Sequence, residues 1–172
     1  GDRILTAPLL DLHSKDGWAE ARGGIRLADH ARRLTVTART LTYRKELIQA
    51  TARGDVRLRT SDADGTVLRV HSDWLTWDHE AQKAGAGGEV RVYYRNVTAT
   101  AGRMAYVRGE QRLDLTGNGN GARPCVRRGT HEIEGERIAL HLQERTYEVL
   151  GRARGVLQPA AAIPPASGEE RP

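Results

Sequence analysis

The chain has 172 residues, with 27 Lys and Arg against 22 Asp and Glu, a net charge of +5 and a single Cys. Its length suits one domain with a core of its own, and its 38% hydrophobic residues with balanced charge do not fit a disordered chain. One Cys excludes an intramolecular disulfide framework and a four-thiolate metal site, and apolar runs of only a few residues exclude a transmembrane helix.

A repeat organises the chain from its beginning. Five apolar pairs, spaced by one residue, recur at intervals of 31, 34, 29 and 34 residues, and we call the first residue of each pair the anchor. The pairs are Leu10/Leu12, Leu41/Tyr43, Leu75/Trp77, Met104/Tyr106 and Ile138/Leu140. Nine and eleven residues after each anchor stand Ala19/Ala21, Ala50/Ala52, Ala84/Ala86, Leu113/Leu115 and Tyr147/Val149. Apolar residues at every second position predict strands with one buried face.

Short polar segments follow each anchor pair and predict turns. They are residues 14–17, 44–46, 78–82, 108–111 and 143–145. Each unit is therefore predicted as strand, turn, strand, and length varies only in the inter-unit loops near residues 28–34, 61–65 and 122–130.

Glycines stand thirteen residues after every anchor and predict structural bends. They are Gly23, Gly54, Gly88, Gly117 and Gly151. Small residues three before each anchor, namely Ala7, Ala38, Ser72, Ala101 and Gly135, predict a second line of bends. Because Gly inside a strand marks a bulge or sharp bend, we expect a long sheet folded at two aligned creases, with its apolar residues on the concave side.

The repeat ends near residue 157. Residues 158–172 contain four prolines and an Ala run, and they predict a disordered tail. The predicted organisation is thus a β domain over residues 1–157 and this tail.

Three stretches of the repeat resemble a known family. They read ARTLTYRKELIQATARGDVRL (38–58), SDWLTWDHEAQKAGAGGEVRV (72–92) and IEGERIALHLQERTYEVLGRARG (133–155). They are similar to the OstA-like family of periplasmic lipopolysaccharide transport proteins, of the LptA and LptC type and related to the periplasmic domain of LptD. Trp77 in place of Tyr, and Gly119 with Gly121 in place of an apolar pair, depart from the family pattern.

The resemblance implies a slightly twisted, open β-jellyroll, or β-taco, whose apolar groove carries the acyl chains of lipopolysaccharide (lipid A) between inner and outer membranes. It also implies end-to-end strand pairing with other jellyroll modules, which allows a homo-oligomer. No enzymatic activity and no cofactor are expected. A periplasmic location is implied, although the chain itself shows no signal or anchor segment.

The apolar positions of the repeat are the candidate lipid-binding groove. They are Leu10, Leu12, Ile25, Leu41, Tyr43, Val56, Leu58, Leu75, Trp77, Val90, Val92, Met104, Tyr106, Leu113, Leu115, Ile138 and Leu140. For each of them, simple core packing is the alternative, because one layer must hold a creased sheet together. The rings of Tyr43, Trp77 and Tyr106 are the best individual candidates for groove walls.

Basic residues occur sixteen positions after the anchors, at Arg26, Arg57, Arg91 and Arg154, with Asn120 in the fourth unit. They are out of phase with the apolar set and should face outward, as a solvated face partly neutralised by Asp55 and Glu89 or as a ladder for phosphates. The basic residues are spread through every unit without an aromatic cluster, so we expect no nucleic acid partner.

Other chemistry has weak support in the sequence. The six histidines show no metal-ligand spacing, so no metal site is expected. Cationic neighbours could lower the pKa of Cys125, yet a lone thiol without a base is expected to be inert.

Two alternative functions stay open. A polysaccharide-acting enzyme on a β-solenoid would need converging carboxylates, but the acids at 55, 78, 80, 89, 110 and 114 share no repeat position. A structural repeat protein would instead have a dry, filled interior.

Overall fold

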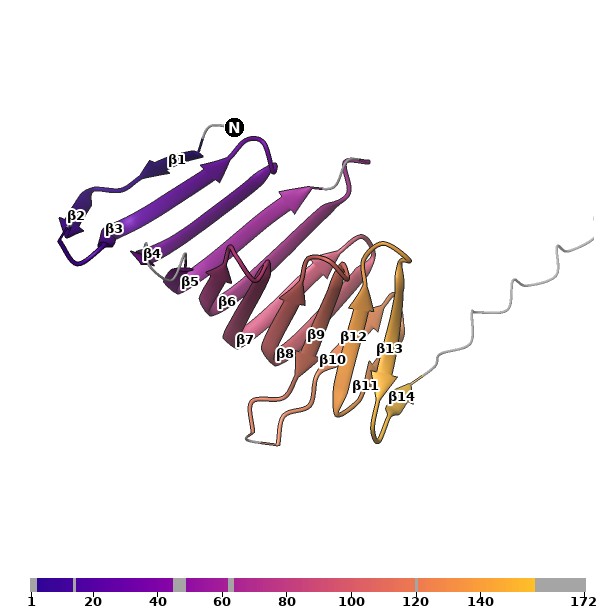
Figure 1. Ribbon diagram of the computed structural model, residues 1–172. Helices are drawn as coiled ribbons and strands as arrows, with labels where there is room; N and C mark the ends of the chain where they lie inside the picture. Colours follow the sequence, from indigo (N-terminus) through magenta and orange to yellow (C-terminus); the bar gives the residue numbers. More distant parts are fainter. Residues whose placement is uncertain (1–2, 14, 45–48, 62–63, 120, 157–172) are drawn as a thin grey trace, which may run out of the picture.

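The computed structural model describes residues 3–13, 15–44, 49–61, 64–119 and 121–156, and these form only strands and connections. The fourteen strands are β1 (Arg3–Thr6), β2 (Leu9–His13), β3 (Trp18–Asp29), β4 (Leu34–Arg44), β5 (Gln49–Ser61), β6 (Val67–Asp78), β7 (Lys83–Tyr94), β8 (Val97–Val107), β9 (Arg112–Thr116), β10 (Cys125–Arg128), β11 (His131–Glu134), β12 (Arg137–His141), β13 (Thr146–Leu150) and β14 (Arg154–Val156). They pair antiparallel in one open sheet (Figure 1). The predicted all-β open jellyroll is confirmed. A helix suited to crossing a membrane is not found in the described part of the chain.

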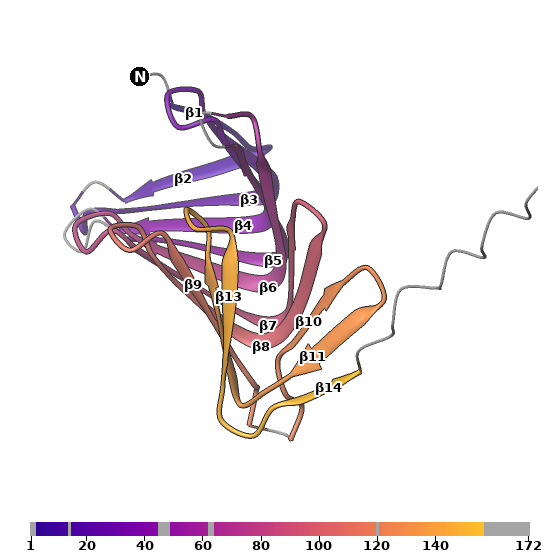
Figure 2. The ribbon, with the colours of Figure 1, turned by 90° about the vertical axis from the view of Figure 1, so that its right-hand side faces the viewer.

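The sheet is folded lengthwise into two arms, which Figure 2 shows as a V. The long strands β3 to β8 cross the fold and contribute one half to each arm, while the short strands belong to one arm only. Arm A contains β1, β10, β11 and β14, and arm B contains β2, β9, β12 and β13. The chain therefore passes from one arm to the other within each of the strands β3 to β8.

The repeat is visible in the strand register of arm B. Each anchor lies opposite the residue eleven positions later, in the pairs Leu10↔Ala21, Leu41↔Ala52, Leu75↔Ala86, Met104↔Leu115 and Ile138↔Val149. One sequence unit is thus two neighbouring strands joined by a turn at the tip of arm B. This is the predicted strand, turn, strand arrangement.

The crease is a row of β-bulges. Between Arg53 and Val56, two residues of β5 lie opposite a single residue of β6, and the same excess occurs at the bend glycines of β3 and β7. An extra residue bends its strand and sharpens the local twist. Gly23, Gly54 and Gly88 have φ values of 88°, 79° and 94°, a conformation that favours glycine.

The structure has one crease where the sequence predicted two. Ile25 pairs with Ala38, and Val90 pairs with Ala101, so the glycines and the small residues alternate on neighbouring strands of a single line. The reason is that antiparallel strands run through the bend in opposite directions. A residue at the crease is therefore thirteen positions after the anchor on one strand and three positions before the anchor on the next strand.

The last units pass the crease by interrupting their strands. Gly151 has φ 82° and separates β13 from β14, whereas Gly117 follows β9 without a positive φ and packs against the backbone of Ala122. Residues 122–130, predicted as a loop, contain β10, because Val126 is buried and its strand pairs with both β8 and β11. The predicted tail, residues 158–172, lies outside the described residues.

Candidate functional site

The predicted groove residues all lie on the inner face of the V, but they differ in exposure. Twelve of the seventeen are buried, namely Ile25, Leu41, Val56, Leu58, Leu75, Val90, Val92, Met104, Leu113, Leu115, Ile138 and Leu140. Trp77 and Tyr106 are partly buried against this core. Leu10, Leu12 and Tyr43 are 49%, 71% and 42% exposed. Most of the candidate groove is therefore a packed core between the arms.

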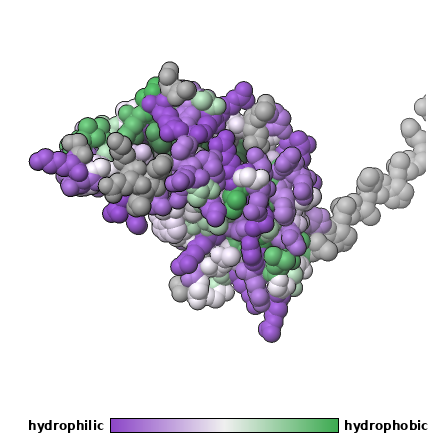
Figure 3. Space-filling model, in the orientation of Figure 1, coloured by the Kyte–Doolittle hydropathy of each residue, from purple (hydrophilic) through white to green (hydrophobic). Residues whose placement is uncertain are grey.

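The exposed members lie at the end formed by β1, β2 and β4. Leu5, on the inner face of β1 opposite Leu27, is 38% exposed there as well. Figure 3 shows hydrophobic surface at this end of the molecule. Since β1 and β2 each pair only with β3, the apolar interior of the V opens toward solvent at this edge of the sheet.

The opposite end of the V is filled. Leu113, Leu115 and Ile138 have at most 1% of their surface exposed, and Ile138 pairs directly with Leu115 across β9 and β12. Interiors packed in this way leave no room for an added hydrocarbon chain. A hydrocarbon chain that binds among these three side chains must first separate the arms.

The arms are joined across their tips at the filled end. The hydroxyl of Tyr94, at the end of β7 in arm A, donates a buried hydrogen bond of 3.1 Å to the Leu142 carbonyl after β12 in arm B. Asp64 in arm A accepts from Arg95 at 3.0 Å and from Arg145 of arm B at 3.3 Å. We call the contacts of these five residues the clasp.

The repeat pattern does not predict the clasp, although it places two of the clasp residues on the inner face. Tyr94 continues the alternation of Val90 and Val92, and Leu142 continues that of Ile138 and Leu140. Both are buried, with 8% and 6% of their surface exposed. The alternation shows that Tyr94 and Leu142 point inward. That these two residues contact each other across the V depends on the fold.

Replacing Tyr94 by phenylalanine should loosen the arm tips. The change removes the hydroxyl and leaves the buried Leu142 carbonyl without this donor, so we expect a loss of about 1–2 kcal/mol in the free energy of unfolding. Amide hydrogen exchange should also accelerate in β12 and β13. Tyr93→Phe is the matched control, since Tyr93 lies on the outer side and makes an edge contact with His71. Equal effects of the two variants in a melt would refute the clasp.

The outer face carries the predicted arginines. Arg57 pairs with Asp55 at 3.0 Å, and Arg91 pairs with Glu89 at 3.3 Å. Arg26 and Arg154 are exposed, and Asn120 lies outside the described residues. Exposed pairs of this kind contribute little to stability. Of the two arrangements that the sequence allowed, Arg57 and Arg91 have the first, a solvated face neutralised by nearby acids.

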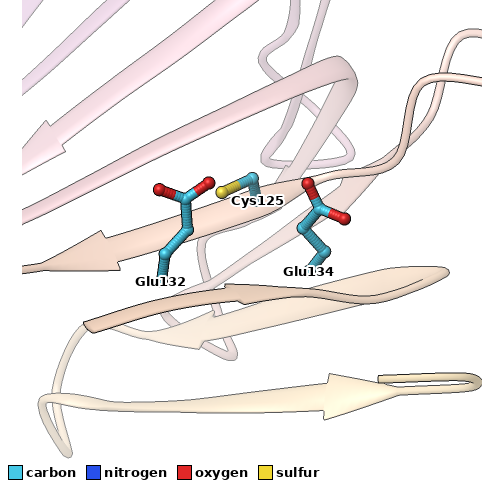
Figure 4. A group of neighbouring side chains, drawn as sticks. All are labelled: Cys125, Glu132 and Glu134. Carbon is cyan, nitrogen blue, oxygen red and sulfur yellow. The ribbon is translucent and has the colours of Figure 1, made fainter. Parts of the chain in front are cut away.

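Cys125, Glu132 and Glu134 form the one group of three potential metal ligands among the described residues, with donor atoms within 4.8 Å of one another (Figure 4). They lie on the outer face of β10 and β11. The Glu132 carboxylate accepts from Arg127 at 2.6 Å, and the Cys125 thiol donates to the same carboxylate. A thiol with carboxylates suits Zn²⁺ in type, but here the Glu132 carboxylate is already bonded to Arg127 and to the Cys125 thiol.

The environment of Cys125 opposes thiolate formation. Burial, together with the hydrogen bond and charge of Glu132, raises the pKa of the thiol to about 11. The sequence suggested that cationic neighbours lower this pKa, which is wrong because the acidic side chains of β11 face the sulfur directly. The expectation that the thiol is inert follows from the raised pKa.

Thiol-specific reagents should therefore modify the folded chain slowly. At pH 8 a pKa of about 11 leaves about 0.1% thiolate, so the rate should be roughly two hundred times lower than for a thiol with the ordinary pKa near 8.5. The rate should rise as pH increases toward 11. Glu132→Gln should accelerate the reaction more than Glu134→Gln, and a fast reaction of the unmodified folded chain at pH 8 would contradict this account.

Comparison with known proteins gives a match at the level of fold. No family model matches the chain, and no curated protein matches it. A solved structure does: LptH, described as the LptA homologous periplasmic component of the conserved lipopolysaccharide transport device from Pseudomonas aeruginosa. The match has 14% sequence identity and a TM-score of 0.54, and it covers 92% of this chain and 96% of that chain. The fold predicted from the resemblance is confirmed, because the chain shares its open β-jellyroll fold with this solved structure.

Proposed function

We propose that the chain is a periplasmic lipopolysaccharide-binding protein that carries or bridges lipopolysaccharide between membranes, with the acyl chains held on the inner face of the V. The observation that carries this proposal is an inner apolar face that runs through both arms and opens to solvent at Leu10, Leu12 and Tyr43. The fold shared with LptH supports it. Contact with apolar side chains alone suits a ligand that must slide rather than react.

Entry of a lipid would begin at the open end. Each methylene group that leaves water contributes about 0.8 kcal/mol, so an acyl chain gains many kcal/mol by lying against the inner face. Part of this gain would be used to separate packed side chains farther along the V. The open end therefore acts as the entrance, and the clasp limits how far the lipid advances.

We propose no catalytic activity. Among the described residues, three or more His, Cys, Asp or Glu side chains converge within 4.8 Å only at Cys125, on the outer face. The acids at 55, 78, 80, 89, 110 and 114 take no part in that group.

A ligand-free structural repeat protein is the second candidate. The twelve buried inner residues favour it, because a filled interior needs no ligand. The two functions differ in one property, which is whether the arms open for a lipid.

Site-specific photo-crosslinking tests the proposal. A photo-reactive amino acid at Leu12 or Tyr43, on the exposed inner face, should capture lipopolysaccharide, while the same group at outward Arg57 should not. At Val90, which is 1% exposed, capture should be weak in the unmodified chain and should increase when Tyr94→Phe is added. Capture from Arg57 alone, or from none of these positions, would exclude the lipid-binding function and favour the structural one.

The two ends of the sheet support end-to-end assembly as part of the same proposal. β1 and β2 have a paired neighbour on one side only, as do β13 and β14 at the other end. Leu9 at the first end and Val156 at the second are 49% and 60% exposed. Unpaired edges template strand addition. Sedimentation velocity should show larger species as concentration rises, and a strict monomer at all concentrations would argue against self-assembly.

A further inference from the structure

The tips of the two arms line an open cavity beside the clasp. Its volume is about 370 Å³, and its walls come from both arms: from the turn between β7 and β8 and the end of β10 on one side, and from β12, β13 and their turn on the other. It lies near the filled end of the V, away from the exposed residues of the open end. A ligand bound in this cavity would contact residues of both arms.

The cavity is strongly cationic. Arg95, Arg128 and Arg145 line it together with His141, whereas no Asp or Glu does. Asp64 pairs with Arg95 and Arg145 from outside the lining. Together with this carboxylate, the three lining guanidinium groups carry an excess of two positive charges. That excess matches the charge of a phosphate monoester.

Arg128 is the guanidinium available to a ligand. It ends β10 on the same side of the strand as Val126, which is buried on the inner face, and it pairs in register with Val97. Its side chain forms no ion pair with any carboxylate in the described ranges of the chain, unlike Arg95 and Arg145. A planar guanidinium in this position can bind a phosphate through two parallel N–H donors.

The rest of the lining is mainly apolar, with Asn96 and Thr146 as its polar members. Leu140 and Leu142 are buried, with 5% and 6% of their surface exposed, and Tyr147 packs against the same core. Arginines above a leucine floor fit a molecule that is anionic at one end and hydrocarbon at the other.

We propose that this cavity binds the phosphate of an amphiphilic headgroup, with Arg128 as the principal ligand-binding residue and Arg95 and Arg145 beside it. The inference rests on the proposed function and adds a headgroup site to the acyl-chain surface. Since Asp64 already holds two of the arginines, the incoming phosphate competes with this carboxylate. Binding at the headgroup site therefore weakens the clasp at the point where the arms must separate.

The test compares diphosphorylated and dephosphorylated lipid A in detergent micelles, using the full chain. Arg128→Gln should weaken binding of the diphosphorylated form about tenfold, the loss expected for one charge-assisted hydrogen bond, and should leave the dephosphorylated form unchanged. The control is Arg59→Gln, the same change at an exposed outer position of β5, which should alter neither. Matching melting temperatures would establish that the variants are folded.

The outcomes separate the two proposals. Equal binding of both lipids, unaffected by Arg128→Gln, would overturn the phosphate site and leave the lipid-binding function standing. Absence of binding by either lipid would overturn both. Inorganic phosphate alone distinguishes a headgroup from a free ion: weak binding through Arg128 supports the amphiphile, and binding as tight as that of lipid A would overturn it.

Discussion

Replacing Leu115 by alanine should lower the free energy of unfolding by about 2–5 kcal/mol, whereas Leu12→Ala should change it by no more than about 0.5 kcal/mol. Both residues belong to the same inward repeat pattern, but Leu115 is fully buried at the filled end and Leu12 is 71% exposed at the open end. The first change creates a cavity between the arms, and the second removes side-chain atoms that already contact water.

Urea unfolding of the two variants measures this difference. The free energy of unfolding should fall with urea concentration at the same slope in both variants, which checks that both unfold in two states. The pair also tests the division of the inner face into an entrance and a core. Similar losses for both substitutions would mean that the V is uniformly open or uniformly filled. In that case the entrance would have to be sought elsewhere.

Gly88→Ala should destabilise the chain by about 1–3 kcal/mol. Gly88 has φ 94°, and an added Cβ would overlap the side chain of Asp73 on the neighbouring strand. The substitution therefore strains the bulge that bends β7 at the crease. Because neighbouring bulges form one line, the angle between the arms should change as well.

Gly109→Ala is the matched control for this prediction. Gly109 lies in the turn between β8 and β9, and a Cβ there meets nothing within 4 Å. The free energy of unfolding of the Gly109→Ala variant should stay within about 0.5 kcal/mol of that of the unmodified chain. Thermal melts with far-ultraviolet circular dichroism report both variants, and a tolerated Gly88→Ala would show that the crease does not depend on glycine geometry.

Much of the fold could be predicted from local patterns. The spacing of Leu75 and Trp77 relative to Ala84 and Ala86 gives the period of a strand and the register of its hairpin, because cross-strand neighbours lie at a fixed distance from the turn. The recurring glycines placed the bend. These features depend on residues close together in the chain, so one sequence contains the necessary information.

The rest depends on contacts between distant residues. Leu12 and Leu140 obey the same rule, yet only Leu140 is buried, because β2 is an end strand that pairs with β3 alone, whereas β12 lies between β9 and β13. The bonds of Tyr94 to Leu142 and of Arg145 to Asp64 join residues separated by 48 and 81 positions. No repeat offset specifies them, which is why the clasp and its cationic cavity appeared only in the structure.

A lipid that binds between the arms should drive them apart. Spin labels at Thr130, in the turn between β10 and β11 of arm A, and at Glu144, in the turn between β12 and β13 of arm B, would measure their separation; both positions are exposed. The labels are introduced as Thr130→Cys and Glu144→Cys in a Cys125→Ser background, and pulsed electron resonance records the distance with and without lipopolysaccharide. We expect a longer distance with lipid bound. An unchanged distance while lipopolysaccharide is demonstrably bound would contradict the account.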